Sequence, residues 1–76
     1  MTREIDRVKF VGLAEKRVSR ALKDIRLIGN LSNRSNYKYT EEDAKKIYRT
    51  LRQALEDMKA RFEHQGNERG DTFTLS

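Results

Sequence analysis

The sequence contains no cysteine and a single histidine, His64. Without cysteine the chain has no disulfide and no thiolate metal ligand, and one histidine leaves no zinc site built from protein side chains alone. A chain of 76 residues rarely gains more than roughly 3–5 kcal/mol from one hydrophobic core. Because neither a disulfide nor a metal can add to that core, we expect oligomerisation to stabilise the fold, most simply as a homodimer.

Long apolar runs are also missing from the chain. No stretch approaches the ~20 apolar residues of a membrane-spanning helix, and Arg3, Glu4 and Asp6 lie where a signal peptide would need an apolar core. We therefore expect a soluble, cytoplasmic protein without a membrane partner. The absence of cysteine agrees with the cytoplasm without establishing it, because many exported proteins also lack disulfides.

Acidic residues are fewer than basic ones, 12 against 17, which gives a net charge of +5. Residues 1–39 carry ten basic and four acidic side chains, whereas residues 40–65 carry six of each. The positive excess therefore belongs to the first half of the chain. Such a field attracts nucleic acid or an acidic protein surface. The alternative is a charged surface that only keeps a small protein in solution.

Apolar residues that alternate three and four apart predict two amphipathic helices. In the first helix, residues 3–29, the apolar positions are Phe10, Val11, Ala14, Val18, Ala21, Leu22, Ile25 and Ile28. In the second helix, residues 40–65, they are Ala44, Ile47, Tyr48, Leu51, Ala54, Leu55, Met58 and Phe62. Gly12 is the weak point of the first helix, where its first turns would fray or bend, because glycine in a helix interior costs ~1 kcal/mol relative to alanine.

The ends of the helices have recognisable signals. Gly29 and Asn30 best tolerate the left-handed conformation of a C-terminal cap, and they predict the end of the first helix. The Asn- and Ser-rich residues 30–39 predict a connecting loop. Thr40 and Asp43 form a capping-box pattern at the start of the second helix. Because Asp43 replaces the usual Glu or Gln, we expect this reciprocal cap to be imperfect.

These elements predict an all-α protein, an antiparallel two-helix hairpin over residues 1–65 with a flexible tail over residues 66–76. Each apolar stripe spans more than a third of its helix circumference, and a hairpin covers only the seam. We therefore expect two hairpins to pair as a four-helix bundle with coiled-coil-like packing. Phe73 and Leu75 are apolar residues in the polar tail, and they either pack back onto the bundle or form a short docking motif.

Support for catalysis is poor. His64 near the end of the second helix is expected to be solvated, and the acidic residues at the start of that helix are explained by the helix dipole. No glycine-rich phosphate loop, nucleophile elbow or HExxH spacing occurs. We expect no enzyme, no cofactor, no metal and no small-molecule substrate.

Two groups of side chains could bind a partner. Basic residues on the first helix, opposite or flanking its apolar stripe, suit phosphates, and the loop combines an arginine and two tyrosines with amides that suit bases. The candidate residues are Lys16, Arg17, Arg20, Lys23, Arg26, Asn33, Arg34, Asn36, Tyr37 and Tyr39. The structural alternatives are a solvated helix face, Asn and Ser side chains that form turns, and tyrosines that plug the end of the bundle.

Two function classes follow from these groups. The first is a non-enzymatic binding module that engages nucleic acid through the basic helix face and the loop. The second is a protein-interaction or regulatory subunit, which binds another protein through the outward residues Leu13 and Leu27 or through Phe73 and Leu75 in the tail. Steep salt dependence of binding distinguishes the first class from the second.

The stretches 26–37 (RLIGNLSNRSNY) and 39–43 (YTEED) resemble a family of small uncharacterised bacterial helical-hairpin proteins. The resemblance covers about residues 16–62, and the ending Phe73-Thr74-Leu75 is also similar. It implies the hairpin fold. It implies no activity, because none is assigned to that family.

Overall fold

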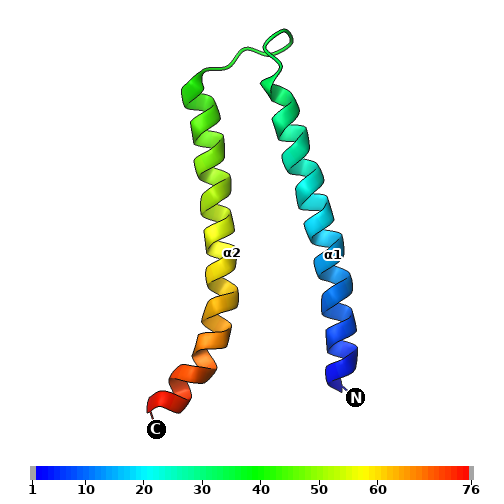
Figure 1. Cartoon of the computed structure of the whole chain (residues 1–76), viewed down its shortest axis with the longest axis vertical. Helices are drawn as coiled ribbons and strands as arrows, with labels where there is room; N and C mark the ends of the chain where they lie inside the picture. The colour runs from blue at the N-terminus through cyan, green and yellow to red at the C-terminus, as the bar shows by residue number, and fades with distance from the viewer. Residues whose placement is uncertain (1, 76) are drawn as a thin grey trace. The chain divides into compact units, whose positions relative to one another are not determined.

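The computed structural model describes the backbone of residues 2–75 and the side chains of residues 3–65. Over that backbone the elements are α1 (Thr2–Gly29), a short 3-10 helix η1 (Asn30–Ser32) and α2 (Glu41–Leu75), shown in Figure 1. No strand occurs among residues 2–75, which confirms the all-α class. The chain divides into two units, Met1–Lys38 and Tyr39–Ser76, and each is described by itself.

Helix α1 confirms the first predicted helix to within a residue at its N-terminal end. Its apolar residues follow the helical repeat of about 3.6 residues per turn, so they form one stripe along the helix. Within this stripe Val11, Ala14 and Ile28 are half-buried, and the remaining members are exposed. Near the N-terminal end the Arg7 guanidinium lies 5.8 Å from the centre of the Phe10 ring, a cation–π contact between residues three apart.

Gly12 does not interrupt α1, which is helical on both sides of it. A Cβ atom added at Gly12 would meet no atom within 4 Å. No close approach therefore requires a glycine at this position, and the residue only lowers the helix propensity.

The end of α1 differs from the expected left-handed cap. Gly29 has φ −59° and ψ −31°, which is right-handed helical backbone, and no residue in the described backbone has a positive φ. The helix instead tightens into η1, after which the Asn33 N–H donates to the Asn30 carbonyl oxygen at 3.5 Å. The prediction of where the helix ends was correct, but the predicted conformation was wrong, because a 3-10 turn satisfies terminal carbonyls without a left-handed residue.

Helix α2 begins with a complete capping box, and here the expectation of an imperfect cap was wrong. The Asp43 N–H donates to Thr40 Oγ1 at 3.0 Å, and the Thr40 N–H donates to Asp43 Oδ2 at 2.9 Å. The Thr40 carbonyl oxygen accepts the first helical bond, from the Ala44 N–H at 3.2 Å. The shorter carboxylate of Asp43 therefore reaches back as a Glu would.

The body of α2 carries the second apolar stripe, in which Leu51 is half-buried and Tyr48, Leu55 and Phe62 are exposed. Outside this stripe, a side-chain hydrogen bond joins two residues four apart: Gln53 Nε2 donates to Asp57 Oδ1 at 2.9 Å. Helix α2 continues to Leu75, ten residues beyond its predicted end at residue 65. Residues 66–76, the predicted flexible tail, lie outside the residues whose side chains are described, so the flexibility of this segment stays a prediction.

No side chain among residues 3–65 is buried. The exposed fraction of large apolar residues reaches 72% at Val8. Each helix, taken by itself, thus leaves its apolar stripe largely exposed. In proteins most helical stability comes from packing of such an apolar face rather than from local interactions.

The capping box predicts different effects of two threonine substitutions on the free energy of unfolding. Thr40→Ala should lower the free energy of unfolding by about 1 kcal/mol, because it removes the acceptor of the Asp43 N–H. Thr50→Ala is the matched control: its hydroxyl donates to the Lys46 carbonyl oxygen at 2.8 Å inside the helix, and alanine there should be neutral or slightly stabilising. Urea denaturation followed by circular dichroism measures both. Equal losses would contradict the capping role.

Gly12→Ala should raise the free energy of unfolding by about 0.5–1 kcal/mol, because alanine has the higher helix propensity and its methyl group meets no atom within 4 Å. Gly29→Ala, also in open space but at the last residue of α1, should give a smaller gain. Thermal denaturation of both variants compares them. A loss of stability in Gly12→Ala would show that another surface approaches the helix at this glycine.

Candidate functional site

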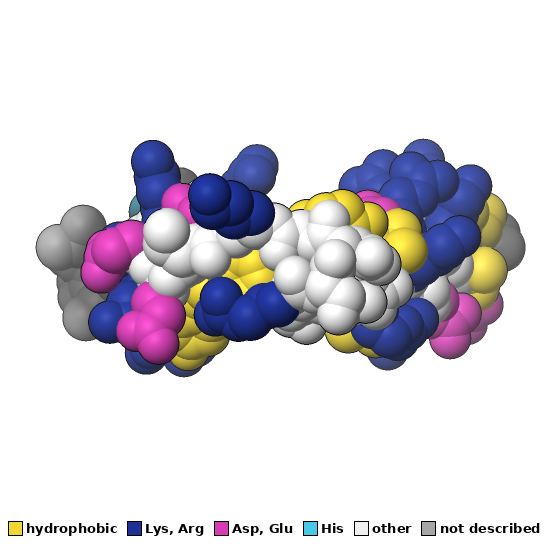
Figure 2. Space-filling view, turned by 90° about the horizontal axis from the view of Figure 1, so that it is seen from above, with side chains coloured by type: hydrophobic (Ala, Val, Ile, Leu, Met, Phe, Trp, Pro, Cys, Tyr) yellow, Lys and Arg dark blue, Asp and Glu magenta, His cyan; other side chains and the backbone are white. Residues whose placement is uncertain are grey.

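Four basic side chains lie along one face of α1, and we call Lys9, Lys16, Arg20 and Lys23 the basic ridge. Successive residues of an α-helix turn by about 100°, so these four positions lie within about 60° of one another and opposite the apolar stripe. All four side chains are exposed. Figure 2 shows exposed Lys and Arg side chains beside exposed hydrophobic ones.

Arg26 is one of the predicted binding residues of the first helix, and Lys9 is not. In α1 the helical repeat turns Arg26 by about 60° from Lys23, onto the flank of the ridge. Arg17 lies on the other flank, close to the apolar stripe, as expected. Lys9 precedes Lys16 by seven residues and Lys23 by fourteen. Because seven residues are nearly two whole helical turns, this spacing is enough to assign Lys9 to the same face from the sequence.

Acidic side chains are sparse around the ridge. Asp24 is four residues after Arg20 and lies on the same flank as Arg17, while Glu15 lies near the opposite flank. Between Asp24 and Glu41 the chain has no acidic residue, and it has three basic ones, Arg26, Arg34 and Lys38. The end of α1 and the loop thus form a continuous acid-free segment.

The loop after η1 is a turn organised by Asn33. Asn33 Oδ1 accepts the Ser35 N–H at 2.9 Å. The Asn33 carbonyl oxygen accepts the Asn36 N–H at 3.1 Å and the Tyr37 N–H at 3.0 Å. Its side-chain oxygen therefore holds the turn together, as Asn commonly does. This geometry gives Asn33 a structural role in the turn, which is the structural alternative to its prediction as a binding residue.

The turn holds Arg34, Asn36 and Tyr37 close together in sequence and space, and all three are exposed. Tyr37 exposes 49% of its surface, whereas Tyr39 is half-buried. Tyr39 also begins the second unit, while the basic ridge and residues 33–38 belong to the first. The first unit therefore contains every candidate binding residue except Tyr39.

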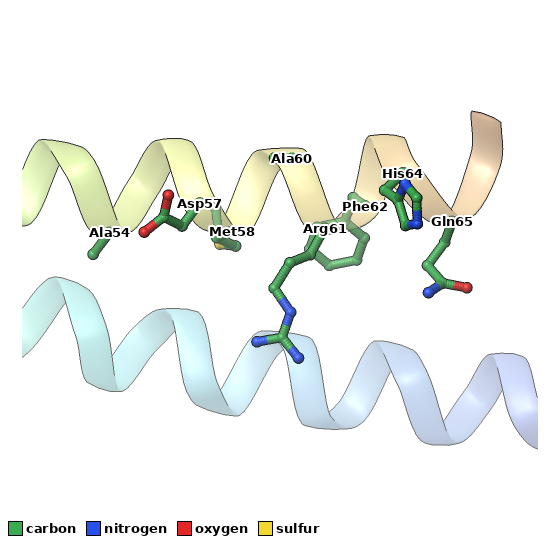
Figure 3. Close-up of a pocket in the computed structure, with 8 residues that line it drawn as sticks. All are labelled: Ala54, Asp57, Met58, Ala60, Arg61, Phe62, His64 and Gln65. Atoms are coloured by element: carbon green, nitrogen blue, oxygen red, sulfur yellow. The ribbon is translucent and has the colours of Figure 1, made fainter. Parts of the chain in front are cut away.

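A hollow lies along one flank of α2, shown in Figure 3, and its lining residues come from that helix alone. Met58 and Phe62 form its apolar part, and Asp57, Arg61 and His64 line its polar side. Because Met58 and Phe62 also belong to the apolar stripe, the hollow is a part of that stripe rather than an enclosed site.

The residues with described side chains contain no group of three or more His, Asp or Glu side chains that could hold a metal ion. Over the same part of the chain, neither α1 nor α2 includes an apolar segment long enough to cross a membrane.

Comparison with known proteins gave no relative: no protein-family model, no curated protein and no solved structure matches the chain. The resemblance to a family of bacterial helical hairpins therefore stays a prediction. The features of the described residues that bear on binding are the basic ridge, the Asn33 turn and the apolar stripes.

Proposed function

We propose that the chain is a small, non-enzymatic module that binds nucleic acid through its first unit. The observation that carries this proposal is the exposed basic ridge on α1, continued by an acid-free loop that displays Arg34 and Tyr37. Lysine and arginine neutralise phosphates, and each phosphate contact releases counterions. Neither a metal nor a cofactor takes part in this proposal.

Charge distribution supports the same surface. Residues 1–39 carry ten basic and four acidic side chains, and residues 40–65 carry six of each. On one flank of the apolar stripe of α2, Arg52 and Glu56 are four residues apart, as are Lys59 and Glu63. Such pairs of opposite charge offset each other's field. The first unit is therefore the one whose field attracts a polyanion.

The proposed assembly is an antiparallel hairpin that dimerises into a four-helix bundle. Its support is the apolar stripe that each helix, taken by itself, leaves largely exposed. Burying a Leu, Ile or Phe side chain stabilises by about 1.5–3 kcal/mol relative to leaving it exposed. A second copy supplies the same stripes in symmetric form. The basic ridge lies opposite the stripe of α1, so both ridges of the dimer stay outside.

The alternative class, a protein-interaction or regulatory subunit, has one observation in its favour. Leu13 lies beside the basic ridge and Leu27 lies in line with it, so neither belongs to the apolar stripe. They expose 39% and 53% of their surface. Apolar contacts of this kind would bind a protein with little dependence on salt. The salt titration below separates the two classes.

Nucleic-acid binding should weaken steeply with salt. With about four phosphate contacts, the affinity should fall roughly 50-fold between 50 and 200 mM salt, and Lys16→Ala with Lys23→Ala should lower the slope of log K against log salt by about 1.5. Fluorescence anisotropy of a labelled oligonucleotide measures both. The control, Lys46→Ala with Lys59→Ala, removes the same charge from exposed positions of α2.

Equal weakening by the two double variants would show that binding follows net charge and not the ridge. If no oligonucleotide binds even at low salt, the proposed function is wrong, and an apolar protein partner at Leu13 and Leu27 becomes the better proposal.

The dimer is tested by a matched pair of leucines, because Leu55 on the apolar stripe and Leu27 outside it are each 53% exposed. Light scattering should give the wild type twice the chain mass of 9.0 kDa. Leu55→Lys should yield monomers with less helix, since it puts a charge in the seam. Leu27→Lys should stay dimeric. A monomeric wild type, or equal effects of the two variants, would contradict this assembly.

A further inference from the structure

We infer that the nucleic acid bound by this protein is single-stranded, and that the ring of Tyr37 stacks on one of its unpaired bases. This inference rests on the proposed function, because it names the class of nucleic acid that the same surface takes. It depends on three observations: the exposure of Tyr37, the hydrogen bonds that hold it, and the chemistry of its neighbours.

Tyr37 differs from the other two tyrosines of the chain in its surroundings. Tyr39 is half-buried, and Tyr48 is 62% exposed but belongs to the apolar stripe of α2, which the proposed dimer covers. Tyr37 is 49% exposed and lies outside both stripes. It is therefore the tyrosine whose ring face can meet a ligand while the helices are packed.

The Asn33 turn holds the backbone of Tyr37 in place. The Tyr37 N–H donates to the Asn33 carbonyl oxygen at 3.0 Å, and the neighbouring Asn36 N–H donates to the same oxygen at 3.1 Å. Together with the bond from the Ser35 N–H to Asn33 Oδ1, these contacts order the turn before any ligand arrives. Less conformational entropy is then lost on binding than with a disordered loop.

The neighbours of Tyr37 suit a polynucleotide. Arg34 and Lys38 flank it in sequence, and the nearest acidic residues are Asp24 and Glu41. Cationic groups that attract the phosphates, together with a ring that stacks on bases of any identity, are the combination used for single strands.

Duplex recognition fits the same surface less well. In a duplex the faces of the bases are stacked on one another, so a tyrosine ring has no base face to contact. Sequence readout in the major groove relies on Arg, Asn or Gln side chains that form paired bonds with base edges. Three of the four ridge residues are lysines, and none is an amide. The ridge therefore suits the phosphate backbone.

The test compares a twelve-nucleotide single strand with the corresponding duplex at low salt, by fluorescence anisotropy. Tyr37→Ala should weaken single-strand binding about tenfold or more, and it should leave duplex binding unchanged. Tyr37→Phe keeps the stacking ring and should bind the single strand nearly as the wild type does. Because the turn bonds to Tyr37 through its backbone, the helical circular dichroism of both variants should match that of the wild type.

A second measurement uses protein labelled with 3-fluorotyrosine, which gives one ¹⁹F signal for each of the three tyrosines. The signal of Tyr37, assigned by its loss in Tyr37→Phe, should shift when the single strand is added. The signal of Tyr48 should not shift, and it serves as the internal control.

The possible results separate this inference from the proposed function. Equal binding of both nucleic acids, with no effect of Tyr37→Ala and no shift of its signal, would overturn the single-strand inference and leave phosphate binding by the ridge intact. A shift of the Tyr48 signal alone would also overturn it. If neither nucleic acid binds the wild type, both proposals are overturned.

Discussion

Covering the apolar stripes is the constraint on which the rest of this small protein depends. Both helices are long and regular, yet no side chain among residues 3–65 is buried. The local interactions present, such as the capping box at Thr40 and the cation–π contact at Phe10, contribute on the order of 1 kcal/mol each. Burial of a few Leu, Ile and Phe side chains would outweigh all of them. The stability of the helices therefore depends on what packs against the stripes.

The surface of α1 has two faces of different chemistry, the apolar stripe and the basic ridge. Its apolar stripe includes Val11, Ala14 and Ile28, which are already half-buried. The basic ridge lies about half a helical turn away. A surface that packed against the stripe would leave the ridge in solvent, so the proposed assembly and the proposed ligand binding would not compete for the same side chains. The Asn33 turn lies beyond the end of α1 and is outside both faces.

The two helices, both bounds of α1 and the start of α2 could be predicted from the sequence, because the repeat of apolar residues is a direct consequence of helix geometry. The end of α2 at Leu75 could not, because the apolar repeat of that helix stops at Phe62. The conformation at the helix ends could not. Gly29 can adopt left- or right-handed backbone, and only the structure shows the right-handed choice. Asp43 could cap fully or partly, and only the structure shows both bonds.

The candidate site was predicted in part, for a similar physical reason. Charged side chains on a regular helix can be assigned to a face from their spacing. Lys9, seven residues before Lys16, is on the ridge by this criterion, although it is not among the predicted residues. An asparagine in a loop can bind a ligand or its own backbone, and its residue type is the same in both cases. Asn33 bonds to the backbone of Ser35. The exposure of the tyrosines could not be predicted either, since residue type does not show that Tyr37 is more exposed than Tyr39.

The proposed dimerisation and the proposed nucleic-acid binding are physically coupled through the order of α1. The four basic residues of the ridge lie on one face only while residues 9–23 are helical, because the alignment is a product of the helical repeat. Most helical stability in proteins comes from packing of an amphipathic face, so the alignment of the ridge depends on a covered stripe. Dimerisation would then order the phosphate-binding surface as well as double it. Affinity for a polyanion would rise with protein concentration through the dimerisation equilibrium, although the two surfaces share no side chain.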